Sequence, residues 1–353
     1  MAERPVAGVA GGWLAAWRRL AGAEDESAAP PRGRRLAVSL LVAAVAGTFC
    51  ALALARPGAA PDFLVFWHHA RTLLDGRSPY LEPFVIGPGR VAPFMYPLPA
   101  AMLVAPFAWL PMATGGGLFF ALSSGLLAYA LLGRGYGALL TFLGGPFILA
   151  ATMGQWSPLL TAAALLPWLG ALTFIKPNLG VAAFAYRPSP ATVAGGLVLL
   201  AASLLLVPRW PLQWVGVLRA GAGIYHAPLT ATAGFLLPLA LLRWRRPEAR
   251  LLLAMACLPQ LLFFYDQLLL WLVPRRAREY ALLSGASLVA WIAWLGELRP
   301  GVGSNQYIVA AEPYVMLGVY VPALAIVLFS RRGEARDASR PSDEGAPAGG
   351  VVA

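Results

Sequence analysis

The sequence predicts an all-α polytopic membrane protein. Its 353 residues are 59% hydrophobic and only 12% charged, and its mean hydropathy is +0.67. A helix that crosses a bilayer needs roughly 17–25 apolar residues. Segments near that length recur at 36–54, 97–112, 115–132, 137–153, 157–175, 190–207, 228–242, 250–274, 279–296 and 311–330. We therefore expect about nine to eleven transmembrane segments.

The distribution of basic residues along the sequence is typical of a membrane protein. The net charge is +11, which in a soluble protein would suggest nucleic-acid binding. Here arginines cluster at the ends of apolar segments: Arg32, Arg34 and Arg35; Arg243, Arg245 and Arg246; Arg275, Arg276 and Arg278; Arg331 and Arg332. Cytoplasmic loops carry such an excess of basic residues. No basic stripe alternates with aromatic residues, so the sequence predicts no nucleic-acid partner.

The chain divides into three regions. Residues 1–35 form an expected cytoplasmic segment with a short amphipathic stretch, "GGWLAAWRRL", able to lie on the membrane surface. Residues 36–330 form the transmembrane domain, and the first apolar segment is interpreted as a retained anchor because no small-residue cleavage pattern follows it. Residues 331–353 are rich in Gly, Pro, Ala and charge, which predicts a disordered cytoplasmic tail. Two cysteines in apolar segments, Cys50 and Cys257, predict neither a disulfide nor a metal site.

The expected topology puts several polar stretches on the outer face. With the N-terminus inside, "PDFLVFWHHARTLLDGRSPYLEP" lies outside as a juxtamembrane helix, and "WPLQWVGVLRAGAG" is a second such stretch. Alternation counted back from the C-terminus places Asp266 at the outer face. Arg134 and Arg187 both favour the inside, which simple alternation cannot satisfy. A half-helix or re-entrant segment near Lys176 would resolve this conflict.

Carboxylates are scarce, which narrows the search for a catalytic base. No acidic residue occurs between Phe84 and Pro247. Asp62 follows the first apolar segment, where a carboxylate could act as a base on a polar substrate at the membrane surface. The alternative is a helix cap, because aspartate before a helical run is a good N-terminal residue. His69 lies seven residues further on the same helical face, where it could bind substrate together with Asp62.

Lys176 is the single lysine of the chain, and every other basic residue is an arginine. It lies inside the apolar stretch "ALTFIKPNLG". Ionisable residues in such segments are costly and usually functional, although a lysine near a segment end can also extend towards the interface. Arginine would extend equally well. The retained ammonium therefore indicates a fitted pocket for a compact charge, typically a phosphate or carboxylate site.

Four further residues are candidates for substrate binding. Gln155 in "MGQWSP" has an indole beside it, a pair that suits a sugar, although an ordinary interhelical loop is the alternative. Tyr96 in "FMYPLP" is also explained by the aromatic belt of a membrane protein. His226 in "GIYHAPL" could be structural. Asp266 in "YDQ" could face the same outer cavity or begin a helix.

Taken in order, these stretches resemble glycosyltransferase family 87, a branch of the GT-C superfamily of multi-span enzymes that includes polyprenol-phosphate-mannose-dependent mannosyltransferases. The matching residues are Asp62, "LLDGRSPY", "FMYPLP", "GQWSP", "IKP" and "YDQLLL", which together cover most of residues 60–275. The resemblance implies a GT-C-like helical bundle and an inverting transfer with Asp62 as general base. Such chemistry requires neither a metal nor another cofactor.

Three functional hypotheses remain open on the sequence. The first is a bacterial cytoplasmic-membrane hexosyltransferase that moves a sugar, with mannose expected, from a polyprenyl-phosphate donor to a lipid-linked or cell-envelope glycan on the outer face. Lys176 would then contact the donor phosphate, an inference from its charge and surroundings. The second is a multi-span transporter or lipid flippase, with Lys176 and Asp266 on a substrate path. The third is a non-catalytic membrane scaffold.

Overall fold

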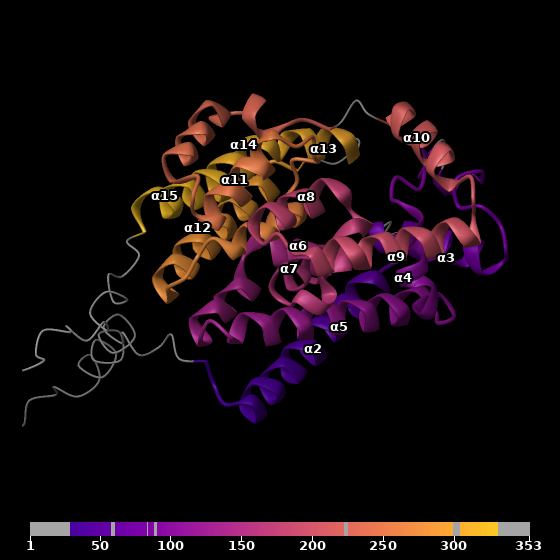
Figure 1. Cartoon of the computed structure of the whole chain (residues 1–353), viewed down its shortest axis with the longest axis horizontal. Helices are drawn as coiled ribbons and strands as arrows, with labels where there is room; N and C mark the ends of the chain where they lie inside the picture. The colour runs from indigo at the N-terminus through magenta and orange to yellow at the C-terminus, as the bar shows by residue number, and fades with distance from the viewer. Residues whose placement is uncertain are drawn as a thin grey trace, which may run out of the picture.

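The computed structural model describes residues 29–57, 61–82, 84–87, 90–221, 225–298 and 304–330. Within these residues the chain is almost entirely helical, and the strands form one two-stranded antiparallel hairpin. Figure 1 shows the helices packed side by side, with the start of the first helix and the end of the last at the same end of the molecule. The predicted all-α class is confirmed. The expected amphipathic stretch at 11–20 and the tail at 331–353 lie outside the described residues.

The elements follow one another with short connections. The first half contains α2 (Arg32–Leu54), α3 (Asp62–Leu74), β1 (Val85–Gly87), β2 (Arg90–Val91), α4 (Leu98–Ala108), α5 (Met112–Leu132), a 3₁₀-helix η1 (Tyr136–Leu143), α6 (Gly145–Met153), α7 (Ser157–Leu165), a 3₁₀-helix η2 (Pro167–Ile175) and α8 (Pro177–Tyr186). The second half contains α9 (Pro190–Leu206), α10 (Trp210–Gly221), the 3₁₀-helices η4 (Pro228–Thr230) and η5 (Gly234–Arg243), α11 (Pro247–Cys257), a 3₁₀-helix η6 (Phe264–Leu272), α12 (Ala277–Leu295), α13 (Ser304–Ala310), α14 (Glu312–Val315), a π-helical turn η7 (Met316–Tyr320) and α15 (Val321–Phe329).

Three described helices are long and apolar enough to cross a membrane. They are Arg32–Leu54, Met112–Leu132 and Gln306–Phe329, and the number rises to five if the bent pairs η1–α6 and α9–α10 each count as one span. Other expected segments are broken or short. The segment expected over 157–175 is two helices, α7 and η2, and the one expected over 97–112 contains only the 11-residue α4.

Prolines explain why these segments break. Proline has no backbone N–H to donate, so it is favoured in the first turn of a helix and disrupts the hydrogen bonding of a helix interior. Pro158, Pro167, Pro177 and Pro190 each lie in the first turn of a separate helix, namely α7, η2, α8 and α9. The helix break expected near Lys176 is present, since η2 ends at Ile175 and α8 begins at Pro177. The central third of the chain is therefore a series of half-length helices.

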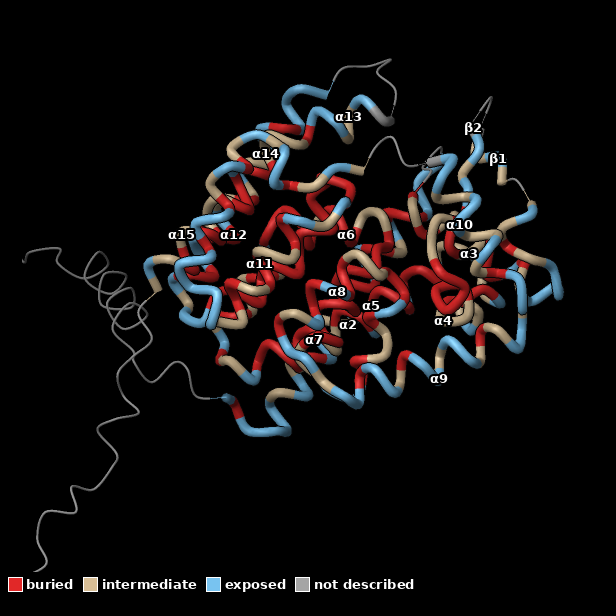
Figure 2. The backbone as a smooth tube through the Cα atoms, turned by 45° about the horizontal axis from the view of Figure 1, so that its top comes forward, coloured by how far each residue is buried: buried red, intermediate tan, exposed pale blue. Residues whose placement is uncertain are grey.

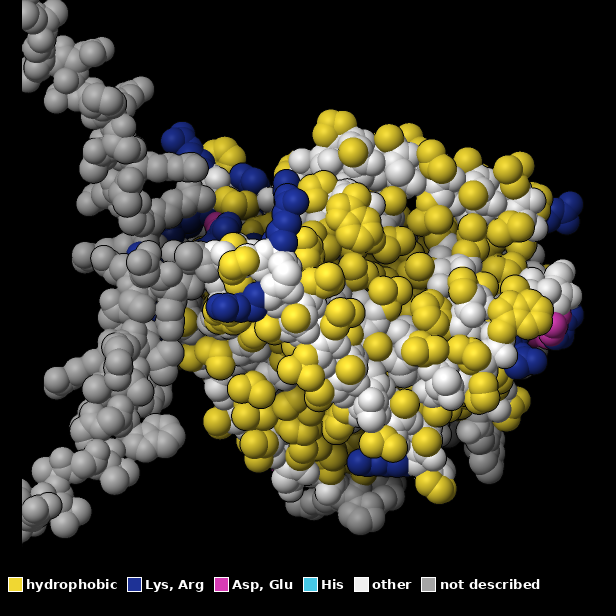
Figure 3. Space-filling model, turned by 90° about the horizontal axis from the view of Figure 1, so that it is seen from below, with side chains coloured by type: hydrophobic (Ala, Val, Ile, Leu, Met, Phe, Trp, Pro, Cys, Tyr) yellow, Lys and Arg dark blue, Asp and Glu magenta, His cyan; other side chains and the backbone are white. Residues whose placement is uncertain are grey.

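The half-length helices bring Arg134 and Arg187 to the same end of the molecule. Arg134 donates a hydrogen bond of 2.6 Å to the hydroxyl of Tyr186, and Arg187 donates to the carbonyl oxygen of Leu165. The C-terminal ends of α5, α7 and α8 thus lie together, because α7 and η2 form a helical hairpin in place of one span. Figure 3 shows a largely apolar face, with several basic side chains at the end beside the grey trace and others at the opposite end and along one edge.

Small residues allow the two longest of the early helices to pack closely. Figure 2 shows buried backbone running through the centre of the molecule, where α2 and α5 meet. A Cβ atom on Gly47 would lie 2.5 Å from Cβ of Ala121, and one on Gly117 would lie 2.7 Å from Cβ of Ala51. Close backbone approach at small residues is the usual way in which helices associate in membranes.

We expect Gly47→Ala to destabilise the protein by about 1–3 kcal/mol, because the added methyl overlaps α5. The matched control is Gly285→Ala in α12, where an added Cβ meets nothing within 4 Å and should be neutral or slightly stabilising. Thermal unfolding in detergent micelles measures both variants. Equal melting temperatures for the two would contradict the close α2–α5 contact.

Candidate active site

Asp62 is the first residue of α3, and Pro61 occupies the capping position before it. The amide of Gln155 donates a hydrogen bond to Oδ2 of Asp62, and the hydroxyl of Tyr265 lies within hydrogen-bonding reach of the same carboxylate. A carboxylate in the first turn is also stabilised by the helix dipole. Asp62 therefore contributes to the helix start and, in addition, faces residues from two distant parts of the chain.

Gln155 reaches Asp62 because of the glycine before it. Helix α6 ends at Met153, and Gly154 adopts a left-handed conformation with φ of +66°. A Cβ at Gly154 would also lie 2.6 Å from Cβ of Phe63, so this position accepts only glycine. The turn points the buried Gln155 side chain at the beginning of α3.

Lys176 and Asp266 form a buried ion pair beside this group. Nζ of Lys176 lies 2.5 Å from Oδ1 of Asp266, and the two side chains are only 10% and 2% exposed. Lys176 occupies the break between η2 and α8, with the extended backbone that a residue before proline prefers. Asp266 lies in the first turn of η6. The only lysine of the chain is thus paired with one of its few acids.

Aromatic rings surround the ion pair. Nζ of Lys176 lies 5.6 Å from the ring centroid of Tyr96 and 5.8 Å from that of Tyr265. These distances allow cation–π attraction. Tyr96 in turn packs 5.8 Å from the ring of Trp156, which follows Gln155. The result is a compact centre, which we call the polar centre: Asp62, Tyr96, Gln155, Trp156, Lys176, Tyr265 and Asp266.

The surroundings of Asp62 change the affinity of its carboxylate for a proton. Its side chain is closely surrounded by protein but keeps partial solvent access. Burial raises the pKa of Asp62, while hydrogen bonds from Tyr265 and Gln155 and the charge of Lys176 oppose that rise. A carboxylate with a raised pKa accepts a proton more readily than an exposed one.

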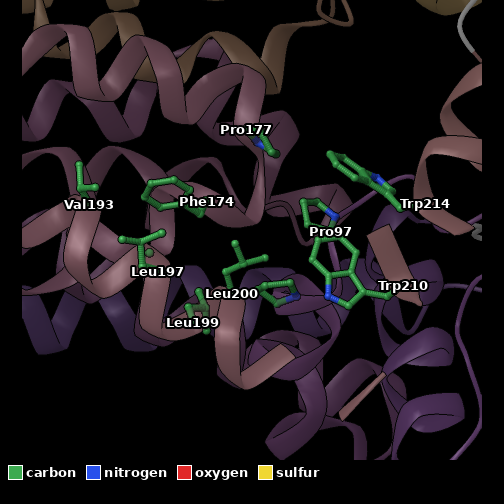
Figure 4. Close-up of a pocket in the computed structure, with 11 residues that line it drawn as sticks. Pro97, Phe174, Pro177, Val193, Leu197, Leu199, Leu200, Trp210 and Trp214 are labelled. Carbon is green, nitrogen blue, oxygen red and sulfur yellow. The ribbon is translucent and has the colours of Figure 1, made fainter. Parts of the chain in front are cut away.

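An apolar groove lies next to the polar centre. Its lining includes Pro97 and Pro177, the neighbours of Tyr96 and Lys176, together with Phe174, Trp210 and Trp214. Its volume is about 190 Å³. Figure 4 shows the two indoles and Pro97 on one side of the groove and side chains of α9 on the other. The groove could hold a hydrocarbon chain whose polar end lies near Lys176.

Two predicted site residues lie apart from the polar centre. His69 is fully buried, with Nε2 3.3 Å from the carbonyl oxygen of Ala92 and its ring packed against Phe94. Burial lowers the pKa of His69 to about 4, so the ring is neutral at physiological pH. His226 pairs its backbone with Gln260, and its side chain is exposed. Helical spacing put His69 on the face of Asp62, but its partners come from the loop before α4.

The sequence does not predict that two tyrosines, Tyr225 and Tyr265, lie near the polar centre. Tyr265 lies beside Asp62, and Tyr225 contributes a hydroxyl whose hydrogen bond to Sδ of Met95 spans 3.6 Å. The charges of Asp62 and Asp266 both reach Tyr225. Tyr225 is followed in sequence by His226, and Tyr265 is followed by Asp266. Both following residues are predicted site residues. The fold shows that Tyr265 and Asp266 are both buried, whereas Tyr225 is partly buried and His226 is exposed.

Among the described residues, no group of three or more His, Cys, Asp or Glu side chains is arranged to hold a metal ion. The polar centre offers instead two carboxylates, an amide, an ammonium and several aromatic rings. This combination can bind hydroxyl groups, accept a proton and contact an anion.

Comparison with known proteins adds no relative: no family model, no curated protein and no solved structure matches the chain.

We expect Lys176→Met to lower the free energy of unfolding by about 3–5 kcal/mol, because it leaves the buried Asp266 without its cationic partner. The double variant Lys176→Met/Asp266→Leu should recover most of this loss. Denaturant unfolding in mixed micelles measures the cycle. Arg77→Met, which breaks an exposed ion pair with Asp75, is the control and should change little. Additive losses in the cycle would contradict the pairing.

Proposed function

We propose that the protein is a membrane glycosyltransferase that moves a sugar, with mannose expected, from a polyprenyl-phosphate donor to a lipid-linked or cell-envelope glycan. The observation that carries this proposal is the polar centre, in which Asp62, Gln155 and Lys176 come together from three separate regions of the chain. Carboxylate, amide and indole groups suit a sugar, and the adjacent apolar groove suits a polyprenyl chain.

The proposed reaction is an inverting displacement. Asp62 accepts the proton of an acceptor hydroxyl, whose oxygen forms a bond to the anomeric carbon of the donor sugar. The bond from that carbon to the phosphate oxygen breaks, and the phosphate leaves with the electron pair and one more negative charge. Lys176 stabilises this developing charge. Gln155 and Tyr265 hold the Asp62 carboxylate towards the reacting hydroxyl.

The membrane arrangement belongs to the same proposal. A GT-C-like bundle with about nine to eleven crossings needs some of the half-length helices to cross the bilayer in tilted or paired form. In Figure 1, α3 and α10 lie at the end of the molecule opposite the start of α2. This position supports their placement at the membrane surface opposite the N-terminal side. With the arginine-rich end in the cytoplasm, the polar centre would face the outer side of a bacterial plasma membrane.

A transporter or lipid flippase is the second candidate. The observation in its favour is a buried Lys–Asp pair at a helix break, since broken helices and intramembrane charges mark the substrate sites of many transporters. The polar centre is, however, a single group beside α3, and the central helices around it are lined by apolar residues. A site at one end of a bundle favours transfer over transport.

We expect Asp62→Asn to lower sugar transfer by a factor of about 10²–10⁴, because the amide cannot accept the proton of the acceptor. The measurement is transfer of labelled mannose from polyprenyl-phosphate-mannose in membranes that contain each variant. Asp75→Asn, at the exposed end of the same helix, is the matched control and should retain activity. Undiminished transfer by Asp62→Asn would reject the assignment of the base.

The pH profile offers a separate test. Asp62 works in its ionised form, so transfer should fall as the pH drops through its raised pKa. Gln155→Leu removes a hydrogen bond that favours the ionised carboxylate, and it should move this acidic limb to higher pH. Gln213→Leu, which removes the amide oxygen that accepts a hydrogen bond from the hydroxyl of Ser78, is the control. A limb that stays in place in Gln155→Leu would show that Asp62 does not set it.

A further inference from the structure

The charges of the polar centre do not balance. With both acids ionised, Asp62 and Asp266 contribute two negative charges, and Lys176 contributes one positive charge. The charged groups whose fields reach Asp266 are Lys176 and Asp62. The groups around them, Tyr96, Tyr225 and Tyr265, are neutral phenols. In this ionisation state the centre has a net charge of −1 before any ligand arrives.

This balance creates a difficulty for any anion that contacts Lys176. The ammonium is already paired with Asp266 at 2.5 Å, in a site where the carboxylate is 2% exposed. An added phosphodiester would bring the local charge to −2. It would also draw Lys176 away from Asp266 and leave that carboxylate buried with no counter-ion, a state that costs several kcal/mol in proteins. Proton uptake removes this cost, because a buried acid without a cation is more stable in its neutral form.

We propose that binding of a phosphate group to Lys176 is coupled to uptake of one proton by Asp266. The proton comes from the solvent and forms the neutral carboxylic acid, while the ammonium transfers its contact from the carboxylate to the phosphate. The inference rests on the proposed function, since it concerns the phosphate of the donor, and it assigns to Asp266 the role of an exchangeable counter-ion.

Asp266 is the acceptor of this proton because its environment depends on Lys176. Its carboxylate forms an ion pair and a hydrogen bond with the Lys176 ammonium, so loss of that contact removes its main stabilisation. Asp62 keeps its contacts with Gln155 and Tyr265 whether or not Lys176 moves, and it retains partial solvent access. The two acids thus have different functions: Asp62 stays ionised as the base, and Asp266 gains the proton.

The experiment is calorimetric titration of the purified full-length protein with farnesyl methyl phosphate. This probe is a phosphodiester with one fixed negative charge, so it contributes no proton of its own. Titration at one pH in two buffers of different ionisation enthalpy counts the protons taken up. We expect about one proton per bound ligand and an affinity that falls about tenfold per pH unit as the pH rises. This measurement needs no variant.

Two variants assign the proton to its site. Asp266→Asn should bind the probe without proton uptake and with little dependence on pH, whereas Asp62→Asn should keep the uptake. Binding of the probe to the wild type without proton uptake would overturn the inference, as would uptake that persists in Asp266→Asn or a failure of the probe to bind. The transfer assay with polyprenyl-phosphate-mannose is independent of these outcomes, so an active enzyme that takes up no proton would leave the proposed function in place.

Discussion

The buried ion pair between Lys176 and Asp266 is the interaction on which the centre of this protein depends. Both side chains are almost fully enclosed, and a charge in such a place is stable only next to its partner. The pair joins the break between η2 and α8 to the start of η6, elements that are about ninety residues apart in sequence. It also fixes the position of Tyr96 and Tyr265, whose rings flank the ammonium. The location of Asp62 beside this group follows from the same packing.

The ion pair is possible because the surrounding helices stop where they do. Prolines end the helical hydrogen-bonding pattern at several points, and Lys176 takes an extended conformation at one of them. Gly154 follows the end of α6 with a left-handed conformation, and this turn directs the Gln155 side chain towards Asp62. Irregular backbone inside a membrane protein is tolerated where it lines a protein-enclosed site. The breaks that make the segments poor spanning helices are thus the features that bring polar side chains together.

Several residues of this centre could be singled out from the sequence, whereas their arrangement in space could not. Lys176 was identifiable because a lone lysine among arginines is unusual, and Asp62, Gln155 and Asp266 because polar residues are rare in apolar stretches. These are properties of single residues in their local context. The segment 157–175 is divided into two helices at Pro167, and the second of them, η2, packs against α8 and α9. Hydropathy along the sequence does not reveal this packing. His69 shows the same limit, because helical spacing put it on the face of Asp62 while its contacts come from the loop before α4.

The contacts of Lys176 and of Arg134 differ in a way that bears on why the chain has one lysine and otherwise only arginines as its Lys and Arg residues. Arg134 uses its planar fork to hold four fixed acceptors: the carbonyl oxygens of Leu272 and Pro274 and the hydroxyls of Tyr186 and Tyr280. Such a fork stabilises one arrangement and resists change. Lys176 presents a compact ammonium on a flexible stem, and this ammonium contacts the Asp266 carboxylate. An ammonium can exchange that carboxylate for another oxygen anion without rearrangement of its neighbours. Arg134 holds separate elements together, whereas the proposed proton uptake by Asp266 requires Lys176 to exchange one oxygen partner for another.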